Sequence, residues 1–225
     1  MIIDAVDVQD RRPEHRFRIT RVGVFGIKKP LYVQRPDRVV TLTITVDASV
    51  DLPADRKGSH LSRNVEVISD IVDASVRKPV KSIELLAQDI CKKLLEKHDY
   101  AKHAEVRISA DYFVEKKTPL GNHSLECYEL IARAVCERDG ICKRGIGVVV
   151  EGMTACPSAM ETIRAIMAKE IGDSAKILEK IPVPTHNQRN RTTVMIFGKD
   201  VDVEANELIE IVEDAMSSPT YGMLK

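Results

Sequence analysis

The sequence predicts an α+β protein built on an antiparallel sheet, with its helices grouped between pairs of strands. Apolar residues alternate with threonines over 39–50, which is the two-residue period of a strand with one buried face. Two stretches of helical periodicity follow at 64–76 and 82–95, and alternation returns over 105–114. Helices placed together between strands favour a helical layer on an antiparallel sheet over a doubly wound parallel sheet.

The N-terminal half begins with a predicted hairpin. Loose alternation over 17–27 predicts a first strand, and the Arg-Pro-Asp sequence at 35–37 supplies a turn into the strand at 39–50. Asn64 and Ser82 are expected to cap the two helices, because each side chain can accept a hydrogen bond from the first helical turn.

The C-terminal half is expected to contain further helices and two more strands. The periodicities predict a helix over 124–137, an apolar strand over 146–151, helices over 158–171 and 174–181, and a strand over 191–197. An acidic helix completes the order. If this half repeats a strand–strand–helix–helix–strand–strand plan, the acidic helix is the first helix of that plan, and the sequence stops after it.

Composition excludes several functional classes. Lys+Arg and Asp+Glu both number 34, so a net charge of zero gives no general attraction to nucleic acid. No apolar run approaches the roughly 18 residues of a membrane span, and the N-terminus lacks the features of a signal peptide. The five cysteines show no framework spacing, which predicts reduced thiols. We expect a cytoplasmic protein that binds neither nucleic acid nor membrane.

Two Pro-marked breaks beside predicted strands each hold one candidate metal ligand. Cys156 lies in the segment 153–158, and His186 lies in the segment 184–189. A thiolate, an imidazole and the Arg189 guanidinium delivered to one place would suit metal-assisted chemistry on an anionic substrate. Taken singly, a buried loop cysteine and a hydrogen-bonding histidine are the plainer interpretations, because the spacing matches no zinc-finger pattern.

A third cluster, residues 55–63, is rich in cations and hydroxyls. It places Arg56, His60 and Arg63 around Gly58, directly before a predicted helix. Backbone N–H groups at a helix start, serine hydroxyls and an arginine fork would suit a polyanion such as a triphosphate. A solvated loop with a capping side chain is the alternative.

The remaining cysteines and histidines are expected to be structural. Cys91 and Cys136 fall in predicted helices with apolar neighbours, which indicates core positions. His98 and His103 flank a helix end, where a cationic side chain would complement the helix dipole.

Taken together, these blocks resemble the metal-dependent GTP cyclohydrolases of the type IB group and their archaeal relatives in methanopterin biosynthesis. The blocks, in order, are Arg-Lys-Gly-Ser-His-Leu-Ser-Arg-Asn (56–64), Gly-Met-Thr-Ala-Cys-Pro (152–157) and Thr-His-Asn-Gln-Arg (185–189). Residues 217–225 resemble a further family block. The long segment between Cys156 and His186 and the run 110–117 favour the archaeal branch.

The resemblance implies the tunnelling fold, an antiparallel sheet with helices on one face. It implies a first module over 1–140, with an N-terminal lead-in and a connecting helix, and an incomplete second module over 141–225 that carries Cys156 and His186. It also implies self-association into dimers or larger oligomers, with active sites between subunits.

The resemblance also implies a reaction. Water activated by Fe(II), with Zn or Mn as possible substitutes, attacks guanine C8 of GTP, and ring opening releases formate. Cys156 would be catalytic and would hold the metal with His186, while Arg56, His60, Arg63 and Arg189 would contact the substrate. The archaeal product is 7,8-dihydroneopterin 2′,3′-cyclic phosphate. The alternatives are dihydroneopterin triphosphate for folate, or a catalytically incomplete structural subunit.

The sequence departs from the family pattern at two places. Ser158 stands where the family usually has the second thiol of Cys-Pro-Cys, and the sequence ends at Lys225. Family members continue with an Arg-x-Asp-Glu stretch, a guanine-anchoring Glu and a Glu-Ser-x-His block. We therefore expect residues 1–225 to supply only two metal ligands, Cys156 and His186, where about four are wanted.

Overall fold

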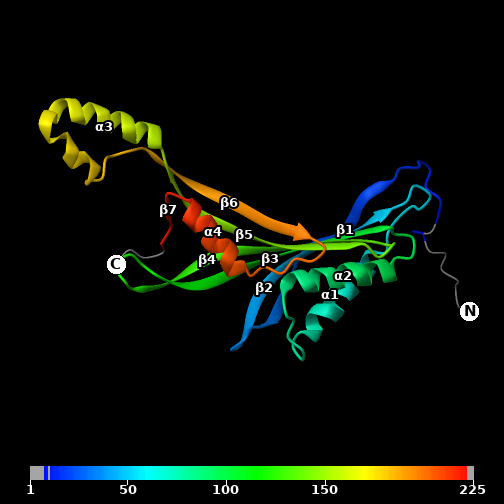
Figure 1. Cartoon of the computed structure of the whole chain (residues 1–225). Coiled ribbons are helices and arrows are strands. Elements are labelled where there is room, and N and C mark those ends of the chain that lie inside the picture. The colour runs from blue at the N-terminus through cyan, green and yellow to red at the C-terminus, as the bar shows by residue number, and fades with distance from the viewer. Residues whose placement is uncertain (1–7, 10, 222–225) are drawn as a thin grey trace, which may run out of the picture.

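The computed structural model describes residues 8–9 and 11–221. Its strands form one antiparallel sheet (Figure 1). Its strands lie in the order β1-β2-β3-β4-β5-β6, and a short β7 pairs with β5. The strand bounds are β1 Ile19–Gln34, β2 Val39–Leu52, β3 His103–Lys117, β4 His123–Glu137, β5 Cys142–Ala155, β6 Asn187–Gly198 and β7 Ser218–Pro219. The predicted hairpin at 35–37 joins β1 to β2, and the predicted α+β class is confirmed.

Three helices share one core with the sheet. They are α1 (Leu61–Ala74), α2 (Ile83–Lys97) and α4 (Ala205–Ala215). Their apolar faces and the even-numbered residues of β2 and β3 belong to a single buried cluster. The helices therefore cover one face of the sheet and leave its other face open (Figure 1), in agreement with a tunnelling-type fold.

The two predicted helix caps had different outcomes. Ser82 caps α2, where its hydroxyl oxygen accepts a hydrogen bond from Leu85 N at 3.4 Å, as predicted. Asn64 does not cap α1, because that helix already begins at Leu61 with His60 in the capping position. Asn64 lies inside the helix and is fully buried, so its side chain is part of the protein interior.

The predicted helix over 124–137 is wrong, because this stretch is strand β4 in the middle of the sheet. Its Glu, Leu, Ala and Arg residues favour helix in isolation, and pairing with β3 and β5 overrides that preference. The period-two signal is present in the buried residues of its helix-facing side, which are Tyr128, Leu130, Ala132, Ala134 and Cys136.

With β4 corrected, the observed order of the first elements is β1-β2-α1-α2-β3-β4. The connecting helix expected at the end of the first module is therefore absent among the described residues of 1–140. The ladder between β4 and β5 continues the same sheet into the second half. The module boundary between 140 and 141 stays a prediction.

An arm connects β5 to β6. It consists of α3 (Pro157–Ile171) and η1 (Gly172–Glu179) and projects from one end of the sheet (Figure 1). The helix predicted over 158–171 is confirmed, whereas the stretch predicted as a second helix over 174–181 is largely the 3-10 helix η1. No residue of α3 is buried, so the arm adds little to the core.

The cysteines are only partly as expected. Cys91 is buried in α2, as predicted. Cys136 lies in a strand rather than a helix, directly opposite Cys142 in the β4–β5 ladder, and the two form a disulfide with Cα atoms 4.2 Å apart. The expectation of reduced thiols fails at this pair because facing strand positions bring the two sulfurs together.

No helix within the described residues is long and apolar enough to cross a membrane.

Candidate functional site

The structure brings Cys156 and His186 side by side. The β5–β6 ladder ends at the pair Ala155 and Asn187, so the next residue on each strand is one of the two candidate ligands. Cys156 N donates a hydrogen bond to His186 O at 3.1 Å. Thr185 Oγ1 donates to Cys156 O at 2.7 Å and holds the two chain segments together from the other side.

The thiol of Cys156 lies at the start of α3. Its Sγ occupies the N-cap position and accepts a hydrogen bond from Ala159 N at 3.4 Å. The sulfur therefore lies beside the backbone N–H groups of the first turn of α3. Cys156 is half-buried and His186 is exposed, which leaves both side chains accessible to a ligand.

A third segment joins this end of the sheet. Strand β7 pairs with Gly152 and Met153, and Ser217 Oγ accepts a hydrogen bond from Ala155 N at 3.0 Å. Gly152 permits this approach, because a Cβ there would lie 1.9 Å from Met216 Sδ. The block resembling the family at 217–225 therefore lies along β5 up to Ala155, the residue before Cys156, and residues 222–225 lie outside the described residues.

The donor set fits a divalent metal in kind. Thiolate and imidazole are ligands that Zn(II) and Fe(II) both accept. Within 8–9 and 11–221, no group of three or more His, Cys, Asp or Glu side chains is arranged to hold a metal ion. The pair of Cys156 and His186 would thus be only part of a ligand set.

Arg189 lies at the same end of the sheet. It follows His186 by three residues on β6 and faces Met153 of β5. Its guanidinium is 3.9 Å from a carboxylate oxygen of Glu151, and three quarters of its side chain is exposed. This weak surface ion pair leaves the cation accessible.

Arg56, His60 and Arg63 lie at the opposite end of the sheet. Their segment follows the end of β2, which is also where β3 and β5 begin and β4 ends (Figure 1). Arg63 Nη1 donates to Lys97 O at 3.0 Å. The guanidinium of Arg56 stacks 4.5 Å above the ring of Tyr100.

A buried hydrogen-bond network underlies this cationic segment, and the sequence alone did not suggest it. His98 Nε2 lies 2.7 Å from Asn64 Oδ1, and His98 Nδ1 lies 3.0 Å from Tyr100 Oη. Tyr100 Oη is 2.6 Å from Ser59 Oγ. At the other end, Asn64 Nδ2 donates to Ala48 O of β2 at 3.3 Å.

The environment of His98 corrects its predicted role. Burial, reinforced by the nearby Arg63 and His60 and opposed by Asp99, lowers the pKa of His98 to about 4. The ring is therefore neutral at physiological pH and cannot complement the dipole of α2 as a cation. The prediction that His98 is structural fits its full burial.

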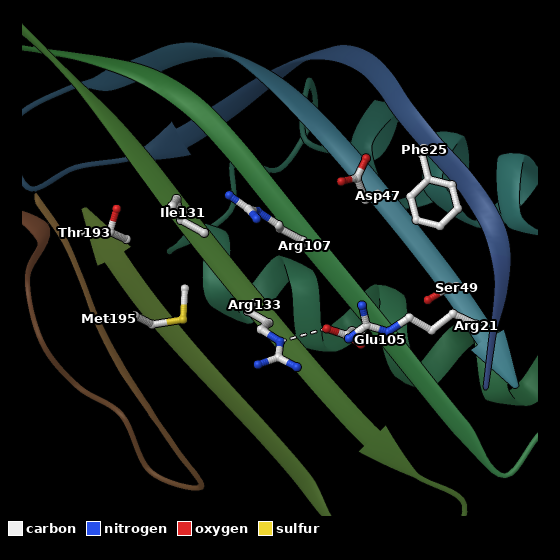
Figure 2. Close-up of a pocket in the computed structure, with 10 residues that line it drawn as sticks. All are labelled: Arg21, Phe25, Asp47, Ser49, Glu105, Arg107, Ile131, Arg133, Thr193 and Met195. Carbon is white, nitrogen blue, oxygen red and sulfur yellow. Dashed lines mark hydrogen bonds and ion pairs between the residues drawn. The ribbon is translucent and has the colours of Figure 1, made fainter. Parts of the chain in front are cut away.

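The open face of the sheet carries a separate pocket of about 520 Å³ (Figure 2). Three arginines and two carboxylates contribute to its lining, and Glu105 pairs with both Arg21 and Arg133. None of the residues predicted for the site lines it. The candidate site is therefore at the two ends of the sheet and not on its open face.

The two ends are far apart within one chain. Strand β5 runs from the cationic end to Cys156 and contains 14 residues, so the ends are separated by roughly 45 Å at a rise of ~3.3 Å per residue. This separation exceeds the length of an extended nucleoside triphosphate. Cys156, His186 and Arg189 are thus grouped with one another and not with Arg56, His60 and Arg63.

The order of elements, the helices on one face and the paired segments at the ends of β5 and β6 define a tunnelling-type α+β protein. The chain belongs to the family of type I GTP cyclohydrolases described as folE2, whose model matches residues 6–225. This family is the one predicted from the sequence blocks.

Similar curated proteins agree with this assignment. GTP cyclohydrolase MptA 1 of Methanocella arvoryzae is 42% identical over 229 residues, which cover 97% of this chain and 73% of the relative. GTP cyclohydrolase MptA of Methanosarcina acetivorans is 38% identical, with 97% and 74% covered. The MptA protein of Methanobrevibacter smithii is 38% identical, with 100% and 76% covered.

Proposed function

We propose that this chain is a GTP cyclohydrolase of methanopterin biosynthesis that opens the guanine imidazole ring and releases formate. The observation that carries this proposal is the contact between the Cys156 and His186 segments at the end of the β5–β6 ladder, in a chain of this family. The likeness to archaeal proteins named MptA supports the methanopterin branch.

Cys156 and His186 would hold the metal. Fe(II) is the proposed ion, with Zn or Mn as substitutes, because a thiolate with an imidazole accepts any of these borderline ions. When bound, the ion supplies Lewis-acid activation of water for hydrolysis at guanine C8. The hydrogen bond from Ala159 N to Cys156 Sγ would hold the sulfur in place at the start of α3.

The cationic residues would bind the substrate's charge. Arg56, His60 and Arg63 surround the start of α1, where backbone N–H groups and guanidinium groups suit a triphosphate. Arg189 would contact the nucleotide near the metal end. The proposed product is 7,8-dihydroneopterin 2′,3′-cyclic phosphate.

The proposed site would require more than one copy of the chain. A single nucleotide cannot reach both ends of a strand that spans roughly 45 Å. The metal-binding end of one copy and the cationic segment of another would therefore meet around one GTP molecule. This arrangement supports self-association, with β1 and β6 as the sheet edges open to a neighbour.

Turnover of GTP tests the proposal. Protein loaded anaerobically with Fe(II) should release formate, and phosphate analysis should identify a cyclic phosphate product. Cys156→Ala and His186→Ala should abolish formate release, whereas His123→Ala, at an exposed histidine paired with Glu115, should not. A triphosphate product would support the folate-type alternative, and the absence of turnover with bound metal would support a structural subunit. Activity that survives both ligand substitutions would overturn the metal site.

A further inference from the structure

The segment Lys97, His98, Asp99 and Tyr100, at the C-terminal end of α2, contacts the candidate triphosphate-binding residues. Four consecutive residues each contact the 56–64 stretch. Lys97 O accepts from Arg63, His98 contacts Asn64, Asp99 lies 3.9 Å from Arg56, and Tyr100 contacts both Ser59 and Arg56.

This supporting segment is itself held rigidly. The guanidinium of Arg138, from the turn between β4 and β5, donates to the carbonyl oxygens of Leu95, His98 and Ala101 at 2.5–2.6 Å. Asp51 Oδ1 accepts hydrogen bonds from the backbone N–H groups of Lys102 and His103, at 2.7 and 2.8 Å. The 97–100 segment is therefore fixed to the sheet and can hold the side chains of the 56–64 stretch in place.

The hydrogen bonds of the buried network join α1 to the 97–100 segment. Asn64 Nδ2 must donate to the Ala48 carbonyl, so Asn64 Oδ1 accepts from His98 Nε2–H. Because His98 is neutral, its Nδ1 then carries a free lone pair, and it lies 3.0 Å from Tyr100 Oη. Tyr100 Oη donates to Ser59 Oγ at 2.6 Å. The Tyr100 hydroxyl thus lies between the buried histidine and the residue that precedes α1.

We propose that Tyr100 is a positioning residue for triphosphate binding, whose ring supports the Arg56 guanidinium and whose hydroxyl anchors Ser59 at the start of α1. This inference rests on the proposed function, because it assumes that the 56–63 segment takes the triphosphate. One side chain aligns a cation and the helix start, so both face the ligand in a fixed relation. Ser59 is therefore an anchored residue at the start of α1.

Binding of inorganic triphosphate to the intact chain, measured by calorimetry at neutral pH, tests this role. Tyr100→Phe keeps the ring under Arg56 and removes one hydrogen-bonded link, so we expect about fivefold weaker binding. Tyr100→Leu also removes the stacking and should weaken binding further. Tyr112→Phe is the matched control, because the Tyr112 hydroxyl contacts only Asn206 at 3.1 Å among the recorded hydrogen bonds, and its affinity should equal that of wild type.

Two further measurements separate positioning from general destabilisation. Ser59→Ala breaks the same link, so the double variant with Tyr100→Phe should bind about as well as either single variant. The ¹⁵N NMR signal of His98 Nδ1 should shift in Tyr100→Phe, because that nitrogen loses the hydroxyl 3.0 Å away, and it should stay in place in Tyr112→Phe.

The outcomes are distinct. If wild-type protein binds triphosphate and Tyr100→Phe binds equally well, the positioning role is wrong while the proposed function stands. Fully additive effects of Ser59→Ala and Tyr100→Phe would also overturn it. If wild-type protein does not bind triphosphate, the assignment of the 56–63 segment in the proposed function fails, and this inference fails with it.

Discussion

The two ends of the sheet are organised in different ways. At the cationic end, a buried network from Ser59 to Asn64 fixes the side chains, and His98 at its centre is fully buried. At the other end, backbone pairing brings Cys156 and His186 together while their side chains stay accessible. The comparison indicates that side-chain contacts order one end, whereas backbone pairing orders the other and leaves its side chains available for the ion that we propose.

The largest effect is expected from breaking the cationic end at its centre. His98→Ala leaves the Asn64 amide and the Tyr100 hydroxyl without their buried partner and creates a cavity, so we expect a loss of about 3 kcal/mol in unfolding free energy. Urea denaturation at pH 7.5 measures it. His123→Ala, at an exposed site, should change stability by less than about 0.5 kcal/mol. Equal effects of the two variants would contradict the comparison.

The same histidine should make stability depend on pH. Its pKa is about 4 in the folded protein, below the usual 6.5, so the folded state favours the neutral ring. The resulting stability is present above about pH 6.5 and is lost as pH falls toward 4, by about 3 kcal/mol in total. Denaturation series between pH 7.5 and 4.5 should show this slope in wild type and a shallower one in His98→Ala. Parallel slopes would show that His98 is not the titrating group.

A smaller effect is expected where β7 meets β5. Gly152→Ala would place a Cβ 1.9 Å from Met216 Sδ, so the flexible methionine must move, at a cost of about 1–2 kcal/mol. A second substitution, Met216→Ala, should remove the clash and make the added Gly152→Ala change nearly neutral. Thermal unfolding of the single and double variants measures both effects. A Gly152→Ala penalty that persists in the Met216→Ala background would refute this explanation.

The smallest effects on stability are expected at the candidate ligands themselves. Cys156→Ala removes the cap of α3, which costs about 0.5–1 kcal/mol and mainly frays a helix with no buried residues. His186→Ala should cost less than about 0.5 kcal/mol, because the side chain is exposed. Thermal unfolding without added metal checks both. A loss near that of His98→Ala would mean that this end is also organised by its side chains.

The sequence predicted the parts of the fold that depend on local periodicity. The hairpin at 35–37, the cap at Ser82 and helix α3 are all present. Strand β4 was mistaken for a helix because its residues favour helix and only its neighbours in the sheet decide otherwise.

The candidate site was predictable only where it lies in short sequence blocks. Family blocks identified Cys156 and His186, and strand pairing explains why residues thirty positions apart meet. The network through Asn64, His98 and Tyr100 could not be read from the sequence, since it joins a helix interior to a segment more than thirty residues later. The facing positions of Cys136 and Cys142 depend on the β4–β5 register in the same way.

We propose that one GTP site combines the Cys156 and His186 end of one copy with the cationic end of another. Mixing two inactive variants, Cys156→Ala and Arg63→Ala, tests this most directly after joint refolding with Fe(II). Each copy then supplies the end that its partner lacks, so formate release should recover at about one quarter of the sites in a random equal mixture. Mixed assemblies that form but stay inactive, or an Arg63→Ala protein that is fully active alone, would contradict the claim.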